Sequence, residues 1–168
     1  LASNGGATRT FALKSGSLAI DAATGSGPDA DQRGVARPKG LARDLGAYEF
    51  EPPAPAVVSI VADGNTLTNA SQVTWTVTFS EAVTGVDAGD FVLGGSAAGG
   101  ATITGVSGSG ATRTVAAATG GGSGQLGLIL ESDGSIHSAY NVALEKGAKG
   151  PAYTVDKIAP AVSVDVLD

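Results

Sequence analysis

The sequence contains no cysteine and no methionine, and it has one tryptophan and one histidine in 168 residues. Without cysteine the chain can form neither a disulfide framework nor a thiolate metal site. The ten lysines and arginines are dispersed, and the net charge is -6. No basic stripe can therefore neutralise phosphates, and we expect no nucleic-acid partner. No apolar run approaches the roughly 20 residues that cross a bilayer, so we expect no membrane insertion.

What the chain has in abundance is glycine, with 26 residues, together with short runs of β-branched side chains. Strong helix formers other than alanine are scarce, so the composition predicts an all-β protein. Because the sequence opens in the middle of a pattern at Leu1, we interpret it as an internal piece of a longer protein.

The stretch from Ser71 to Leu93 organises the predicted fold. Apolar residues Val73, Trp75, Val77 and Phe79 alternate with polar ones, which predicts a strand with one buried face. A buried face requires a second sheet opposite it. Trp75 is expected in the core between the two sheets rather than on a ligand-binding surface.

Seven strands are predicted after the linker, separated by glycine-rich turns. Their expected ranges are Val57–Ala62, Gln72–Phe79, Phe91–Leu93, Ala101–Val106, Thr112–Ala117, Gln125–Leu130 and Ala152–Val155. Seven short strands in about a hundred residues is the number typical of an immunoglobulin-like sandwich.

Residues 1–50 differ from this pattern, because their short apolar pieces are separated by long polar turns. Three short sequence motifs occur here in this order: Leu13–Asp21 (LKSGSLAID), Asp31–Pro38 (DQRGVARP) and Asp44–Glu49 (DLGAYE). The segment resembles the carboxy-terminal end of right-handed parallel β-helix proteins of bacterial surfaces, the choice-of-anchor type. The resemblance implies a last coil and its cap, with Asp31, Arg33, Arg37 and Asp44 as a charge-paired lid. The alternative is that these charges belong to a polysaccharide-cleaving site.

The proline-rich segment 51–55 predicts a semi-rigid linker. We therefore expect a β-helix end over 1–50, a linker over 51–55 and a sandwich over 56–160. The start of the sandwich, Pro55–Ile60 (PAVVSI), recurs as Pro160–Val164 (PAVSV). This repeat predicts that residues 161–168 open a further module of the same kind.

The predicted sandwich also resembles a known family. Thr76–Asp87 (TVTFSEAVTGVD), Asp90-Phe91, Gly105–Gly110 (GVSGSG) and Asp133–Ile136 (DGSI) are similar to the bacterial Ig-like repeat of adhesins and other surface proteins. Related repeats commonly continue with DAAGNPL, whereas this chain has His137–Leu144 (HSAYNVAL) and so lacks an Asp and a Gly. Because of this departure, the resemblance does not assign a binding role to that loop.

A calcium site is one interpretation of the acidic loops. Loop ends in such a sandwich would bring Glu81, Asp87 and Asp133 near Glu51, and Ca²⁺ prefers about six to eight oxygen ligands. The alternative is that these loops are simply solvated.

A hydrolase site is a second interpretation, suggested by Ser132, Asp133, Ser135 and His137. A catalytic triad, however, requires members from different elements, with the base oriented by a buried carboxylate. We therefore expect no catalysis there.

The function expected from these patterns is structural and adhesive. The chain would be part of a large secreted bacterial cell-surface protein or extracellular fibre, joining a β-helix to a tandem Ig-like stalk. Its expected partners are neighbouring domains of the same chain, with self-association into fibres or binding of surface glycans as further possibilities. The alternative is a non-catalytic C-terminal accessory region of a β-helix polysaccharide-active enzyme. A dedicated glycan-binding module ranks last, because it would need exposed aromatic residues.

Overall fold

A computed structural model describes residues 1–161 of the chain. It is an all-β structure with two four-stranded sheets and one two-stranded sheet. The strands are β1 (Val57–Ala62), β2 (Leu67–Thr68), β3 (Gln72–Phe79), β4 (Val83–Thr84), β5 (Phe91–Gly94), β6 (Thr102–Ser107), β7 (Thr112–Ala118), β8 (Gly124–Leu130), β9 (His137–Ser138) and β10 (Ala148–Val155). Two short 3-10 turns, η1 (Ala88–Asp90) and η2 (Ala98–Gly100), flank β5. Among the described residues, no helix has the length and apolar character needed to span a membrane.

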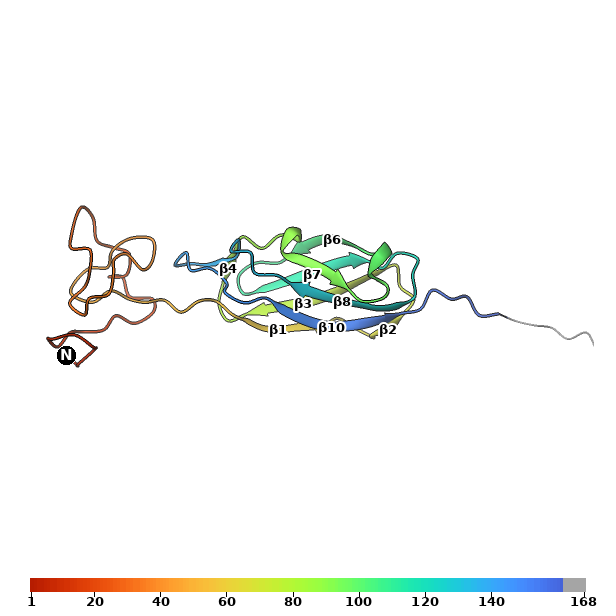
Figure 1. Ribbon diagram of the computed structural model, residues 1–168, viewed down its shortest axis with the longest axis horizontal. Coiled ribbons are helices and arrows are strands. Elements are labelled where there is room, and N and C mark those ends of the chain that lie inside the picture. Colours follow the sequence, from red (N-terminus) through yellow and green to blue (C-terminus); the bar gives the residue numbers. More distant parts are fainter. Residues whose placement is uncertain (162–168) are drawn as a thin grey trace, which may run out of the picture.

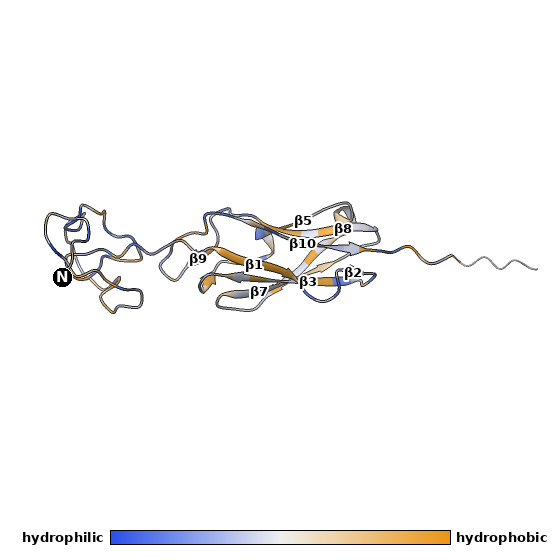
Figure 2. Cartoon of the chain, turned by 90° about the horizontal axis from the view of Figure 1, so that it is seen from below, coloured by the Kyte–Doolittle hydropathy of each residue, from blue (hydrophilic) through white to orange (hydrophobic). Residues whose placement is uncertain are grey.

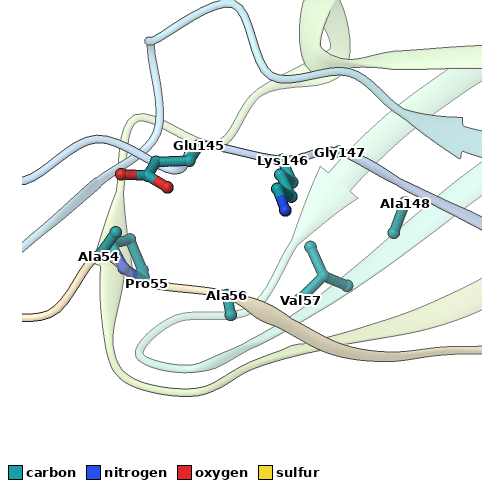
Figure 3. Close-up of a pocket in the computed structure, with 8 residues that line it drawn as sticks. All are labelled: Ala54, Pro55, Ala56, Val57, Glu145, Lys146, Gly147 and Ala148. Carbon is teal, nitrogen blue, oxygen red and sulfur yellow. The ribbon is translucent and has the colours of Figure 1, made fainter.

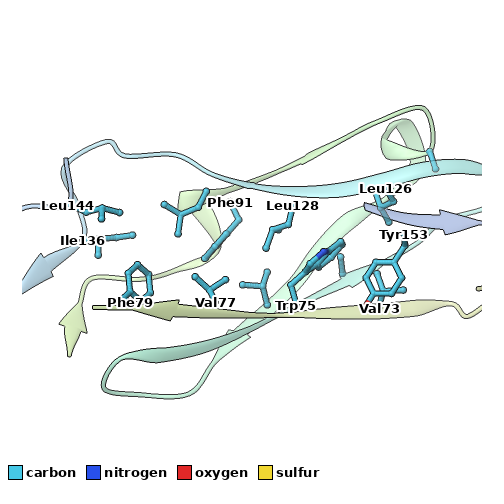
Figure 4. Close-up of a cluster of buried hydrophobic side chains, with 14 of the residues drawn as sticks. Val73, Trp75, Val77, Phe79, Phe91, Leu126, Leu128, Ile136, Leu144 and Tyr153 are labelled. Carbon is cyan, nitrogen blue, oxygen red and sulfur yellow. The ribbon is translucent and has the colours of Figure 1, made fainter. Parts of the chain in front are cut away.

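The two larger sheets pack against each other and enclose the core (Figures 1 and 4). Their strand orders are β1-β3-β7-β6 and β2-β10-β8-β5. We call residues 57–155 the two-sheet region. Alternate residues of β3, β7 and β8 point inward, as the period-two pattern predicts. The buried apolar residues are Val73, Trp75, Val77, Phe79, Val83, Phe91, Ala97, Val115, Ala117, Leu126, Leu128, Leu130, Ile136, Leu144, Tyr153 and Val155.

Trp75 lies at the centre of this core, as predicted, with no exposed surface. Its indole N–H donates to the carbonyl oxygen of Pro151 at 2.9 Å. The ring of Tyr153 meets it edge-on, with ring centroids 5.1 Å apart. Because β3 and β10 belong to different sheets, these contacts tie the two sheets together (Figure 4).

All seven predicted strands are present, but the last one begins four residues earlier than expected. The sequence prediction placed Lys149, Gly150 and Pro151 in a turn, whereas they lie within β10. The pairing of β10 with β8 shifts register between Lys149 and Ala152, so the strand absorbs the proline as a bulge. Gly150 is required here, because a Cβ atom would lie 2.4 Å from Ile60 Cγ2.

Three two-residue strands were not predicted, and β2 is the most informative of them. After β1 the chain crosses to the other sheet, where β2 pairs in parallel with the end of β10. Gly64, with φ of 83°, lies in the turn that makes this crossing. The first two strands of the two-sheet region therefore lie in opposite sheets.

Residues 1–56 contain no strand, only two isolated antiparallel bridges, Ala2–Thr10 and Ala30–Ala36. The coil of a parallel β-helix expected over 1–50 is therefore not seen. Hydrogen bonds to carboxylates hold this N-terminal segment together in place of a strand ladder.

The predicted strand Ala161–Leu167 and the further module over 161–168 lie, apart from Ala161, outside the described residues.

The two ends of the two-sheet region lie at opposite ends of its long axis (Figure 1). The linker reaches β1 at one end, and the chain leaves β10 at the other. We call these the linker end and the far end. In the view of Figure 2, the N-terminal segment again lies beyond the linker end.

Candidate functional site

The acidic residues proposed for calcium lie at the linker end. Val57 pairs with Phe79, and Phe91 pairs with Leu130, so Glu81, Asp87 and Asp133 all follow or precede strands at that end. This placement agrees with the sequence interpretation. The structure does not bring Glu51 into the same group, because its carboxylate pairs with Arg33 at 3.3 Å.

Within residues 1–161, no three acidic or histidine side chains are grouped closely enough to hold a metal ion. Two of the proposed ligands instead stabilise their own loops. Asp87 Oδ1 accepts the backbone N–H of Gly89 at 2.7 Å, and Asp133 Oδ1 accepts that of Ser135 at 2.9 Å. The nearby side chain and the backbone N–H of Ser135 lower the pKa of Asp133. Calcium binding by Glu81, Asp87 and Asp133 stays a prediction.

If these residues bind calcium, adding the ion should raise the thermal midpoint of the chain, because a ligand that binds the folded state stabilises it. The rise should disappear in an Asp87→Ala, Asp133→Ala double variant. The measurement is a melting curve with calcium and with a chelator. Identical midpoints in the unsubstituted chain would contradict the calcium interpretation.

The carboxylate that does connect these loops is Asp90, which sequence reasoning did not single out. It is 2% exposed, and it accepts the backbone N–H of Asp87 at 2.7 Å and the hydroxyl of Ser135 at 2.5 Å. Its own carbonyl oxygen accepts the N–H of Glu131. Asp90 therefore fastens the turn before β5 to the loop after β8.

Replacing Asp90 with alanine should lower the free energy of unfolding by about 1–3 kcal/mol, because two hydrogen bonds to a buried carboxylate are lost. Urea denaturation followed by tryptophan fluorescence would measure the loss. Asp133→Ala is the matched control, since Asp133 is exposed and makes one local turn. Equal and small losses in both variants would show that the Asp90 contacts do not stabilise the fold.

The residues that invited a hydrolase interpretation do not form a catalytic arrangement. Ser135 Oγ donates to Asp90, and Ser132 Oγ donates to the carbonyl of Glu145 at 3.1 Å. The ring of His137 contacts the carbonyl oxygen of Ser135 at 2.8 Å rather than a serine hydroxyl. His137 lies in β9 and is partly buried.

A second polar cluster lies in the N-terminal segment. Its predicted members Asp31, Arg33, Arg37 and Asp44 are joined by Glu49, which is 0% exposed and was not recognised as central. Arg33 pairs with Asp31 at 2.8 Å, and Arg37 pairs with Glu49 at 3.2 Å. We call these five residues the buried charge cluster.

Backbone N–H groups satisfy most of the carboxylate oxygens of this cluster. Glu49 accepts from Lys39 and Asp44, whereas Asp44 accepts from Asp21 and Phe50. The lid interpretation had expected Asp44 to be ion-paired. Among the described residues it has no ion-pair partner, and it instead anchors backbone from two distant turns. The guanidinium of Arg33 also stacks over the Tyr48 ring at 3.7 Å.

The pKa of the Asp31 carboxyl is lowered by its surroundings. Burial raises its pKa, but the backbone N–H of Glu49, the guanidinium of Arg33 and the N–H groups of Arg33 and Val35 lower it more, to about 2. Since the folded pKa is lowered, the stabilisation is present above the usual aspartate range and is lost as the pH falls toward 2. The cluster therefore holds the segment together at neutral pH.

Asp31 and Arg37 also line a hollow of about 440 Å³. Glycoside cleavage generally uses two carboxylates on opposite sides of the bond. Asp31 is the one carboxylate in this lining, and its two oxygens accept four hydrogen bonds from Arg33, Val35 and Glu49. This geometry favours the structural interpretation of the cluster over the polysaccharide-cleaving one.

A hollow of about 320 Å³ lies at the linker end, where the linker passes the start of β10 (Figure 3). Glu145 and Lys146 are its titratable side chains, and both are exposed. The rest of the lining is Ala54, Pro55, Ala56, Val57, Gly147 and Ala148. Such small side chains offer no convergent set of polar groups for a substrate.

No protein-family model, curated protein or solved structure matches the chain. The structure itself shows an all-β fold with two four-stranded sheets and a small strand pair.

Proposed function

We propose that the chain is a structural and adhesive segment of a large secreted bacterial cell-surface protein or extracellular fibre. In this proposal the N-terminal segment closes the end of a parallel β-helix, and the two-sheet region is an Ig-like spacer of a tandem stalk. The observation that carries the proposal is the end-to-end path of the chain, which enters at the linker end and leaves at the far end (Figure 1). Modules with this path add length when they are joined in series.

The strand order supports an Ig-like spacer. If β1, β3, β5, β6, β7, β8 and β10 are lettered A to G, one sheet has the order A-B-E-D and the other contains G-F-C. The constant-type immunoglobulin sandwich has the same strand order in its two sheets, which supports the proposal. The parallel pairing of β2 with β10 extends the second sheet.

Exposed apolar side chains support an end-closing role for the N-terminal segment. Leu18 is 95% exposed and Phe11 is 72% exposed, and Leu1, Leu41 and Leu45 are also more than half exposed. A small folded segment gains stability when such side chains are covered. An open end of a solenoid offers an apolar surface of this kind.

The edge strands of the β1-β3-β7-β6 sheet affect whether two copies of the chain could associate by pairing their strands. β1 and β6 are its outer strands, and each has a register shift against its partner, at Val57/Ser59 and Ile103/Gly105. Bulges of this kind disfavour addition of a further strand. Fibre formation, where it occurs, is therefore expected end to end rather than along these edges.

The test is surface labelling of intact cells of the source organism with an antibody against the two-sheet region. Labelling of unpermeabilised cells, together with reduced attachment of cells that lack the gene, is the expected result. Labelling that requires permeabilisation would overturn the proposal. Surface labelling with normal attachment but lost polysaccharide degradation would support the accessory-region alternative instead.

A further inference from the structure

The loop between β9 and Leu144 projects from the two-sheet region toward the N-terminal segment (Figure 1). It belongs to the part of the sequence that departs from the Ig-like repeat pattern. The buried Ile136 and Leu144 anchor its two ends in the core, and the N–H of Leu144 donates to the carbonyl of Ile136 at 2.8 Å. The base of the loop is therefore fixed to the sheets.

Ser138 holds the tip of this loop in one shape. Its side chain is 4% exposed, and its hydroxyl accepts the N–H groups of Tyr140 at 3.2 Å and Val142 at 3.3 Å. The backbone N–H of Ser138 donates to the carbonyl of Val142, and its carbonyl accepts the N–H of Asn141. Asn141 has a φ of 60°, which closes the turn. These bonds fix the backbone from which the Tyr140 side chain projects.

Tyr140 contacts the N-terminal segment at two places. Its ring packs against Phe50, with centroids 5.6 Å apart and planes tilted by 58°. Its hydroxyl accepts the N–H of Gly16 at 3.3 Å and lies 3.5 Å from Ser15 Oγ. Phe50 is itself held by the buried charge cluster, because its N–H donates to Asp44. Both sides of this contact are therefore anchored in their own regions.

We propose that the loop of residues 138–142 is an intramolecular docking element, in which Tyr140 fixes the N-terminal segment against the linker end of the two-sheet region. Relative motion is the usual state of two regions that share a small interface. The prolines of the linker restrict its bending but do not by themselves select one orientation. The Tyr140 contact supplies the additional point of attachment that selects it. This inference concerns the chain itself and holds wherever the protein is located.

The experiment uses the absence of cysteine, which lets two spin labels be attached at introduced cysteines without removing native ones. Ser26→Cys labels the N-terminal segment and Ser109→Cys labels a turn of the two-sheet region, and both serines are exposed. Pulsed dipolar spectroscopy on the whole chain then measures the distribution of distances between the labels. We expect a single narrow peak for the doubly labelled parent.

Tyr140→Ala in this background should lose the narrow peak and give a broad distribution, whereas Tyr140→Phe, which keeps the ring, should stay narrower than Tyr140→Ala. Phe11→Ala is the matched control, because it removes an exposed aromatic ring away from the joint and should leave the peak unchanged. Phe50→Ala repeats the test from the other side, and unfolding followed by Trp75 fluorescence verifies that each variant retains the two-sheet fold. A broad distribution in the parent, or an equally narrow one in Tyr140→Ala and Phe50→Ala, would overturn the proposal.

Discussion

Replacing Trp75 with alanine should destabilise the two-sheet region by about 3–5 kcal/mol, the usual cost of truncating a buried ring. The side chain has no exposed surface and contacts Tyr153 and Pro151 of the opposite sheet. Neighbouring core residues such as Val115 and Ala117 are too small to fill the space. Since domains of this size have about 5–15 kcal/mol of stability, the variant should be largely unfolded or melt far below the parent.

Far-UV circular dichroism during urea denaturation measures this loss without depending on tryptophan fluorescence. Trp75→Phe is the matched control, because it keeps an aromatic ring and removes only the indole and its bond to Pro151. It should lose clearly less than the alanine variant. A near-parental midpoint for Trp75→Ala would show that this residue is not the centre of the core.

Replacing Glu49 with alanine should disorder the N-terminal segment and leave the two-sheet region folded. The change removes the partner of Arg37 and the acceptor of two backbone N–H groups, those of Lys39 and Asp44. Removing one member of a buried ion pair costs roughly 3–5 kcal/mol, because the other charge stays buried without its partner. The segment has no large apolar core to offset such a loss.

Two-dimensional amide spectra of the whole chain separate the two effects. Signals of the N-terminal segment should collapse to disordered positions in Glu49→Ala, while those of the two-sheet region keep their dispersion. Glu51→Ala is the control, since its side chain is 51% exposed and makes one longer contact with Arg33. An unchanged spectrum for Glu49→Ala would mean that the buried charge cluster does not hold the segment together.

The strands of the two-sheet region could be predicted because their patterns are local. Val73 to Phe79 alternates without exception, and the buried face of β3 follows that alternation residue by residue. The short strands β2, β4 and β9 could not be predicted, since two residues carry no periodicity. Lys149-Gly150-Pro151 has the composition of a turn, and only the neighbouring β1 and β8 make it part of a strand.

The polar contacts were predicted less well, because they depend on which turns meet in space. Asp31, Arg33 and Arg37 were recognised from their clustering in the sequence, whereas Glu49 completes the cluster from a turn that closes on them. Asp90 lies near Ser135 only because β5 and β8 are paired. Nothing in the local sequence marks Tyr140, whose hydroxyl lies next to Ser15 and Gly16, more than a hundred residues away along the chain.

The path of the chain also determines how tension would act on it. β2 runs parallel to β10, with Thr154 N–H donating to Thr66 and Asp156 N–H donating to Thr68. Force applied through the linker pulls β2 toward the linker end, and force applied through the C-terminal side pulls β10 toward the far end. The bonds between them are then loaded together in shear rather than opened one after another. In the proposed stalk, this geometry would let the two-sheet region transmit force along the chain.

Single-molecule force spectroscopy measures whether the two-sheet region resists tension, with the chain held at cysteines introduced at Glu51 and Lys157. We expect one cooperative unfolding event, with a gain in contour length that matches release of residues 57–155 at roughly 3.3–3.6 Å per residue. The same chain held at Ser109 and Lys157 should unfold at a different force, because the β2–β10 bonds are no longer loaded in the same direction. Gradual extension without a distinct event when the ends are pulled would contradict a mechanical role for the two-sheet region.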